Sequence, residues 1–179
     1  ARVPYEAGKT YTYTQLNRFD HLNYVTTDGS RVGTLYRNNV CANSQYTIFR
    51  VQTTEGTVTY GCYDTKGLNE LLDASQSVDL SKEAPRKKII YSLTQSGADQ
   101  IVRPNGSFQG VELASKNVIL TCGGAGDVAP MIGKMNSAGT YQCQATIANV
   151  GTSSINGLQS LNGKLYFAIV GDSTADGQK

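Results

Sequence analysis

Hydrophobic and polar residues alternate along much of the chain, as they do in strands that bury one face. In residues 9–16 (KTYTYTQL), Tyr11 and Tyr13 fall on one face of an extended chain and the threonines fall on the other, which is typical of a strand. Continuous apolar runs at 117–122 and 165–170 predict buried strands. The apolar run at 165–170 belongs to a predicted strand over residues 164–170. Further strands are predicted at residues 22–27, 32–37, 88–95, 100–103, 111–113 and 140–148.

The clearest hairpin is predicted in the first half of the chain. Residues 45–52 and 57–63 are strand-like, and the polar segment between them ends in Gly56, which is typical of a tight connection. A turn centred between Thr54 and Glu55 would place Cys62 opposite Thr47.

Only one segment has helical spacing. Leu68, Leu71 and Leu72 lie on one face of a helix over residues 67–75. Residues 79–88 are polar and charged and contain Pro85, so we expect a linker there. The elements together predict an all-β fold, antiparallel and of Greek-key or sandwich type, with at most one or two short helices.

The two halves of the chain share a pattern of cysteines. Both contain Thr-Tyr-x-Cys, at residues 59–62 and 140–143, and in each half another cysteine lies 21 residues earlier, at Cys41 (62 − 41 = 21) and Cys122 (143 − 122 = 21). We therefore predict two similar β repeats of about 80 residues. Repeat 1 would span residues 1–84 with a Cys41–Cys62 disulfide, and repeat 2 residues 85–179 with Cys122–Cys143. The repeats would form two domains or be fused as a single sandwich.

In each Thr-Tyr-x-Cys segment, a tyrosine lies two residues before the cysteine. Tyr60 and Tyr141 hold this position, which is similar to the tyrosine corner of immunoglobulin-type sandwiches. The cysteines lie too close in sequence for the inter-sheet bridge of that family, and the chain has no tryptophan. The resemblance therefore supports the sandwich architecture and not membership of the family.

Charge and composition exclude several function classes. The net charge is only +2, and the one basic run is Arg86-Lys87-Lys88, so nucleic acid is not an expected partner. No apolar run approaches the roughly 20 residues that span a bilayer, so membrane insertion is not expected. The cysteines form no C-x-x-C motif and His21 is the sole histidine, so we expect no metal site.

No motif predicts a catalytic or cofactor-binding residue. His21 follows Asp20, but the chain lacks the G-x-S-x-G motif of a nucleophile. Gly123-Gly124-Ala125-Gly126 lacks the spacing of a phosphate-binding loop. Asp172 and Asp176 have no defined calcium loop around them. We expect no cofactor and no enzymatic activity.

The polar surface offers other candidates. Eleven tyrosines supply amphipathic side chains suited to contacts, and Tyr11, Tyr13, Tyr60 and Tyr141 are the predicted contact residues. Asn105 begins a sequon for N-glycosylation in a predicted turn.

These observations favour a non-enzymatic structural or adhesive subunit of a surface appendage, filament or coat. It would assemble through sheet edges and Tyr/Thr-rich surfaces. One alternative is a secreted binding module that recognises a receptor, glycan or target protein through loops such as 42–46 and 123–137. Another is a secreted hydrolase that uses acidic residues. Because the sequence begins with Ala1, we expect either removal of a signal peptide and a secreted or cell-surface protein, or removal of an initiator methionine and a virion protein.

Overall fold

The computed structural model of the chain describes residues 6–12, 16–95, 108–124, 129–148, 150 and 153–170. Strands make up most of this part of the chain, with two short helices. The prediction of a mostly β protein built from antiparallel sheets is confirmed.

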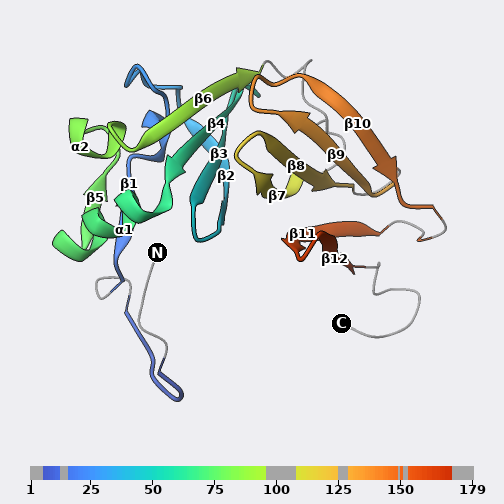
Figure 1. Ribbon diagram of the computed structural model, residues 1–179, viewed down its shortest axis with the longest axis horizontal. Helices are drawn as coiled ribbons and strands as arrows, with labels where there is room; N and C mark the ends of the chain where they lie inside the picture. Colours follow the sequence, from blue (N-terminus) through green and yellow to red (C-terminus); the bar gives the residue numbers. More distant parts are fainter. Residues whose placement is uncertain are drawn as a thin grey trace.

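The first sheet is antiparallel and has four strands. In spatial order these are β2 (Leu35–Ala42), β3 (Tyr46–Thr53), β4 (Val58–Asp64) and β6 (Ile89–Gln95) (Figure 1). The predicted β3–β4 hairpin is confirmed, but its register differs by one residue, since Cys62 lies opposite Ile48 and not Thr47. The reason is the turn, which is centred on Glu55: the Thr53 amide donates to the Thr57 carbonyl over 2.9 Å.

Helical and short extended segments cover one face of this sheet (Figure 1). They are β1 (Arg18–Asp20), the 3₁₀ turn η2 (Leu22–Tyr24), α1 (Thr65–Ala74), β5 (Ser77–Asp79) and α2 (Glu83–Arg86). The predicted helix is confirmed as α1, which begins after Asp64 because that carboxylate accepts hydrogen bonds from two backbone amides of the first turn. Neither α1 nor α2 is long and apolar enough to cross a bilayer.

Two predictions for this part of the chain are wrong. Residues 22–27 form η2 and a turn and not a strand, because Val25 is fully buried in a hydrophobic cluster with Phe49, Tyr63 and Leu68. Residues 79–88, expected as a linker, include α2. The parallel pairing of β1 with β5 was not predicted.

The second sheet is also a four-stranded antiparallel meander. It contains β7 (Phe108–Ser115), β8 (Val118–Gly123), β9 (Met131–Asn136) and β10 (Tyr141–Thr146), in the order β10-β9-β8-β7. Neither four-stranded sheet has the predicted Greek-key order, because each places the strands in chain order. The segment 123–137, expected as a loop, contains all of β9.

A separate two-stranded hairpin follows, formed by β11 (Ser154–Leu161) and β12 (Lys164–Val170). Asn162 and Gly163 connect the strands with φ angles of 52° and 71°, the left-handed conformations that a tight hairpin turn requires. β12 was predicted, whereas β11 was not.

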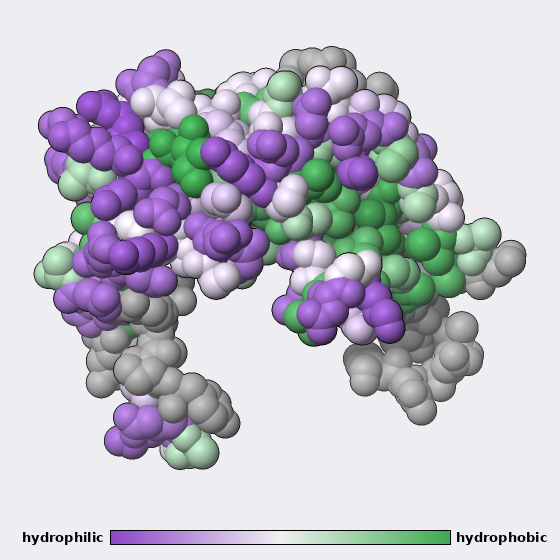
Figure 2. Space-filling model, in the orientation of Figure 1, coloured by the Kyte–Doolittle hydropathy of each residue, from purple (hydrophilic) through white to green (hydrophobic). Residues whose placement is uncertain are grey.

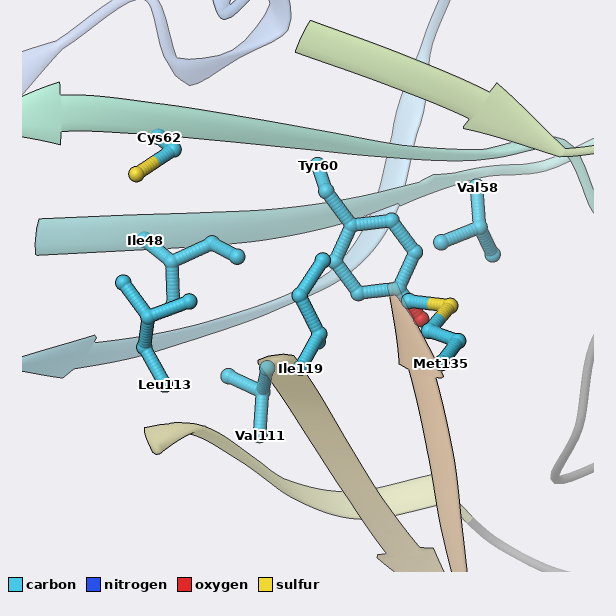
Figure 3. Close-up of a cluster of buried hydrophobic side chains, with 8 residues drawn as sticks. All are labelled: Ile48, Val58, Tyr60, Cys62, Val111, Leu113, Ile119 and Met135. Atoms are coloured by element: carbon cyan, nitrogen blue, oxygen red, sulfur yellow. The ribbon is translucent and has the colours of Figure 1, made fainter. Parts of the chain in front are cut away.

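The two four-stranded sheets bury one hydrophobic cluster between them (Figure 3). The first sheet contributes Ile48, Val58, Tyr60 and Cys62, and the second contributes Val111, Leu113, Ile119 and Met135. Side chains of β3 alternate, so that Ile48 points to the second sheet while Phe49 and Val51 pack on the helical side. The result is a sandwich-like packing of two sheets with a further apolar layer outside the first.

The predicted disulfides are not formed, and all four cysteines are free thiols. Cys41 on β2 and Cys62 on β4 both lie opposite Ile48 on β3. Their Cα atoms are therefore two strand spacings apart, about 9–10 Å, whereas a disulfide needs Cα atoms within about 7 Å.

The same geometry separates the second pair. Cys122 on β8 lies opposite Ile132 on β9, and Cys143 on β10 lies opposite Lys134 on the same strand. The shared spacing of 21 residues thus spans three strands of a meander in both halves. It does not confirm a duplicated unit, since α1 has no counterpart among the described residues of the second half.

The predicted strand over residues 9–16 is also wrong where the structure describes it. Residues 9–12 and 16 form no strand. The Lys9 amide donates to the Glu6 carbonyl over 3.2 Å, and Gly8 has a φ of 77°, so a turn precedes this segment. Residues 6–12 extend away from the sheets (Figure 1).

A cavity in the shared cluster should destabilise both sheets together. Met135 is fully buried, and its replacement by alanine should lower the free energy of unfolding by about 2–5 kcal/mol. We expect Met135→Ala to unfold in urea as one transition, monitored by far-ultraviolet circular dichroism and by tyrosine fluorescence. Two separate transitions, with only one shifted, would show that the sheets fold independently.

The thiols should differ in reactivity. Cys143 is exposed and Cys122 is buried, and burial raises the pKa of the Cys122 thiol to about 11 and that of Cys41 to about 12. A thiol with a pKa of about 12 is ionised at pH 8 to roughly one part in 10,000, and the thiolate is the reactive form. Ellman's reagent at pH 8 should therefore label one thiol rapidly in the native protein and four in denaturant without reductant. Fewer than four in denaturant would indicate a disulfide.

Candidate functional site: the β11–β12 hairpin surface

The hairpin packs on the outer face of the second sheet, opposite the shared cluster. Ile155 of β11 is fully buried there, and its carbonyl accepts a hydrogen bond from the Cys122 thiol at 3.5 Å. β11 crosses β7 so closely that a Cβ atom on Gly110 would lie 3.0 Å from the Cα of Gly157. A larger residue at position 110 would therefore require the backbone of the hairpin to shift by a few tenths of an ångström.

A buried carboxylate ties the hairpin to both sheets. Glu112 of β7 is only 6% exposed. Its Oε1 accepts hydrogen bonds from the Ser160 amide (2.9 Å) and the Ser160 hydroxyl (2.7 Å), and its Oε2 accepts one from the Cys41 thiol (2.8 Å). A buried carboxylate is costly unless its oxygens are hydrogen-bonded, so these donors from β2 and β11 hold the three elements together.

The environment of Cys41 keeps its thiol protonated. Burial is the main cause that raises the pKa of this thiol to about 12, and the hydrogen bond to Glu112 raises it further. Cys41 is therefore a hydrogen-bond donor in this contact and a poor nucleophile.

Strand β12 forms an open edge with apolar side chains on both faces. It pairs with β11 on one side, and no other strand among the described residues pairs with it. Tyr166 and Val170 are 53% and 48% exposed, and Phe167 and Ile169, on the opposite face of the strand, are also exposed. The run 165–170 was expected to be buried, and this prediction is wrong because only β11 of the hairpin rests on the sheet.

Most of the large hydrophobic side chains that are exposed among the described residues lie on the hairpin: Leu161, Tyr166, Phe167, Ile169 and Val170. Figure 2 shows hydrophobic surface over the second sheet beside the hairpin, whereas the end that carries the helices is mostly hydrophilic. Soluble monomers seldom expose large contiguous apolar patches. An unpaired strand edge within such a patch is also a template for pairing with another chain.

A pocket of about 490 Å³ adjoins the hairpin turn. The loop residues Asn43, Ser44 and Gln45 line one side, and residues 160–165 line the other. Glu112, Leu113 and Leu120 also contribute to its walls. The loop predicted over residues 42–46 as a binding loop thus faces the hairpin turn across this pocket.

The predicted contact tyrosines do not gather at one place. Tyr141 is exposed on the edge strand β10 and Tyr11 is half-buried. Tyr60 is not at the surface, because it lies in the shared cluster and is only 3% exposed. Tyr13 and the sequon residue Asn105 lie outside the described residues.

Tyr60 instead accompanies a buried arginine. Arg50 lies opposite Tyr60 in the β3–β4 ladder and is 1% exposed. Burial lowers the pKa of Arg50 and raises that of Tyr60, while the attraction between the two groups partly offsets both shifts. Arg50 Nη2 also donates to Gln52 Oε1 over 3.3 Å. Neither residue was predicted to form this pair.

His21, the residue considered for catalysis, contacts β5. His21 Nδ1 contacts Asp79 Oδ1 at 3.0 Å, not its neighbour Asp20, whose carboxylate accepts from the Ser77 hydroxyl. The described part of the chain holds no group of three His, Cys, Asp or Glu side chains that could bind a metal ion. Asp172 and Asp176 lie outside it.

Comparison of the chain with protein-family models, with curated proteins and with solved structures finds no match.

Loss of the Glu112 contacts should loosen the hairpin. Ser160→Ala removes the hydroxyl donor and leaves the backbone donor, and should lower the free energy of unfolding by about 1–2 kcal/mol. We expect amide hydrogen exchange in residues 154–170 to be faster in this variant than in the wild type, with exchange in β7 to β10 little changed, measured by mass spectrometry. The matched control is Ser154→Ala, whose hydroxyl donates to Asn156 Oδ1 on the same strand. Equal exchange in the two variants would contradict a role for Glu112 in seating the hairpin.

Proposed function

We propose that this protein is a non-enzymatic structural or adhesive subunit that assembles with other copies through its open sheet edges. The observation that carries the proposal is β12, an apolar strand with exposed side chains on both faces and one edge that no other described strand pairs with. Natural proteins usually protect such edges with charge, proline or a covering segment, and β12 has one charged residue, Lys164, at its first position.

The edge of β10 also supports the assembly proposal. All six residues of β10 are exposed, including Tyr141, and β10 is the outermost strand of its sheet. Among the described residues, β10 and β12 therefore each have one edge that no other strand pairs with. Two edges per subunit allow contacts with two neighbours, as a filament or coat requires.

The free thiols indicate in which compartment the protein would assemble. Secreted proteins commonly hold their cysteines in disulfides, whereas Cys41, Cys62, Cys122 and Cys143 are all unpaired here. This difference favours a coat or virion subunit over a secreted appendage within the same proposal.

A binding module is the second candidate function, favoured by the pocket between residues 43–45 and the hairpin turn. Its volume of about 490 Å³ suits a small polar ligand such as a sugar unit. A glycan that protected residues 43–45 and 160–165 from hydrogen exchange, on a protein that stays monomeric, would favour this function over assembly.

Charge placed on the β12 edge should prevent assembly. Tyr166→Lys/Val170→Lys puts two lysines on the outward face of the strand, where they add no buried charge but repel a second copy. By size-exclusion chromatography with light scattering over a range of protein concentrations, we expect wild-type protein to form higher-mass species and this variant to remain monomeric.

The matched control is Tyr36→Lys, which places a lysine at another highly exposed aromatic position, on β2. It should assemble like the wild type. A wild-type protein that stays monomeric at every concentration would rule out the assembly proposal.

A further inference from the structure

An apolar pocket lies on the helical side of the first sheet, where β2 forms the edge. Its volume is about 310 Å³, which is at the lower end of the range for ligand pockets. Its lining includes Val40 and Ala42 of β2 and Leu68 and Leu72 of α1. No residue of the described strands β11 and β12 lines the pocket, so the hairpin of the same molecule does not fill it.

Two phenylalanine rings give the pocket an aromatic side. Phe19 of β1 and Phe49 of β3 both line it, with ring centroids 5.5 Å apart and ring planes at 78°. This is the edge-to-face arrangement in which aromatic rings attract one another. Phe49 also packs edge-on against the buried Tyr63, with centroids 5.4 Å apart. The packing of Phe49 on both rings fixes a surface on which a further aromatic ring can pack.

Hydroxyl groups form another part of the lining. The Oγ1 atoms of Thr47 and Thr65 lie 2.8 Å apart and form a hydrogen bond, and both residues line the pocket. Each hydroxyl oxygen has two lone pairs, so the pair can still accept a hydrogen bond from an incoming hydroxyl group. The pocket therefore combines aromatic contacts with a hydrogen-bond acceptor, the two features that a phenol ring requires.

Strand β12 presents a phenol ring at the surface. Tyr166 is 53% exposed. Its neighbour Leu165 lies opposite Ser160, whose hydroxyl donates to Glu112 of the second sheet. Because side chains alternate along a strand, Tyr166 lies on the face of the hairpin that points away from the second sheet.

We infer that Tyr166 of one copy occupies the pocket between α1 and strands β2 and β3 of a second copy. The inference rests on the proposed assembly function and names the surface that receives the outward face of β12. The ring packs on Phe19 and Phe49, and its hydroxyl donates to the hydroxyl pair. Large aromatic side chains that fill pockets contribute most of the binding energy of many protein interfaces.

The charges around the two surfaces are complementary. After residue 108 the described part of the chain has lysines at its surface, and its single carboxylate is buried. Lys164 lies two residues from Tyr166 and so shares its face of β12. Helix α1 exposes one ammonium group and two carboxylates, those of Asp73 and of Glu70, which also contacts Lys88 over 3.5 Å. The contact thus brings a cation to a helix of net negative charge.

A contact between a protruding side chain and a pocket elsewhere on the molecule joins copies head to tail. Figure 1 shows α1 and β1 at the end of the molecule away from the hairpin, so one copy can use its tyrosine and its pocket at the same time. Contacts of this kind extend into open chains unless their rotation closes a ring.

Two variants that remove opposite halves of the contact test the inference. Ala42→Phe fills the pocket from an exposed position on an edge strand, and Tyr166→Ala removes the side chain that enters it. By light scattering over a range of protein concentrations, we expect each variant to associate at least about tenfold more weakly than the wild type. An equimolar mixture should restore a species of twice the monomer mass, because one variant keeps the tyrosine and the other keeps the pocket.

Two further variants serve as matched controls. Asn38→Phe puts the same side chain on the same face of β2, four residues from Ala42 and outside the pocket lining, and should associate like the wild type. Tyr166→Phe keeps the ring and loses the hydroxyl, and should weaken association only about two- to tenfold. Circular dichroism should show the same fold for all variants.

Free 4-methylphenol, which has the ring and hydroxyl of a tyrosine side chain, probes the pocket without a second copy. Added to the Tyr166→Ala protein, it should shift the methyl resonances of Leu68 and Leu72 in nuclear magnetic resonance spectra. It should cause no such shift in Ala42→Phe/Tyr166→Ala, in which the pocket is filled. Added in excess to the wild type, it should lower the mass of the assembled species.

The remaining outcomes separate this inference from the proposed function. If Ala42→Phe assembles like the wild type while Tyr166→Ala does not, or if 4-methylphenol shifts neither leucine, the pocket does not receive Tyr166 and assembly through β12 still stands. If both variants assemble like the wild type, the inference is wrong and the edge of β10 remains. If the wild type never assembles, the proposed function and this inference both fail, and bound 4-methylphenol would mark a site for a free phenol.

Discussion

Burial of one hydrophobic cluster between two antiparallel sheets is the constraint on which the rest of this structure depends. Ile48 and Tyr60 on one side meet Ile119 and Met135 on the other, and this contact sets the position of the second sheet. The hairpin is then seated on the outer face of that sheet through Ile155 and Glu112. The exposed edge of β12 therefore depends on packing that begins two layers away.

The two faces of each sheet have different neighbours, and these neighbours determine which surfaces stay open to other molecules. The first sheet is covered by α1 and its flanking segments on one face and by the second sheet on the other. The second sheet is covered only in part, because β11 crosses β7 and β8 and leaves β10 exposed. Most of the exposed large apolar side chains among the described residues thus lie in the second half of the chain.

Local patterns predicted much of the fold, since alternation and helical spacing depend on near neighbours. The β3–β4 hairpin and α1 follow from such patterns. The pairing of the cysteines could not be predicted in this way, because equal spacing in sequence does not reveal that β3 or β9 lies between the partners. β11 was missed although Asn162-Gly163, a strong hairpin signal, follows it directly.

The candidate site was harder to predict than the fold. An apolar run such as 165–170 indicates a strand but not whether another layer covers it, and Glu112 gave no signal because its donors, Cys41 and Ser160, are 71 and 48 residues away. Tyr60 shows the same difficulty: its position in a strand was evident, but its burial beside Arg50 depends on the second sheet.

The hydrophilic end of the molecule that carries α1 and α2 has a practical consequence. It lies on the side of the first sheet away from the hairpin, so a fluorophore or affinity tag attached near α2 would leave the exposed strands unobstructed. Such a label would allow the proposed assembly to be followed by fluorescence without blocking the hairpin.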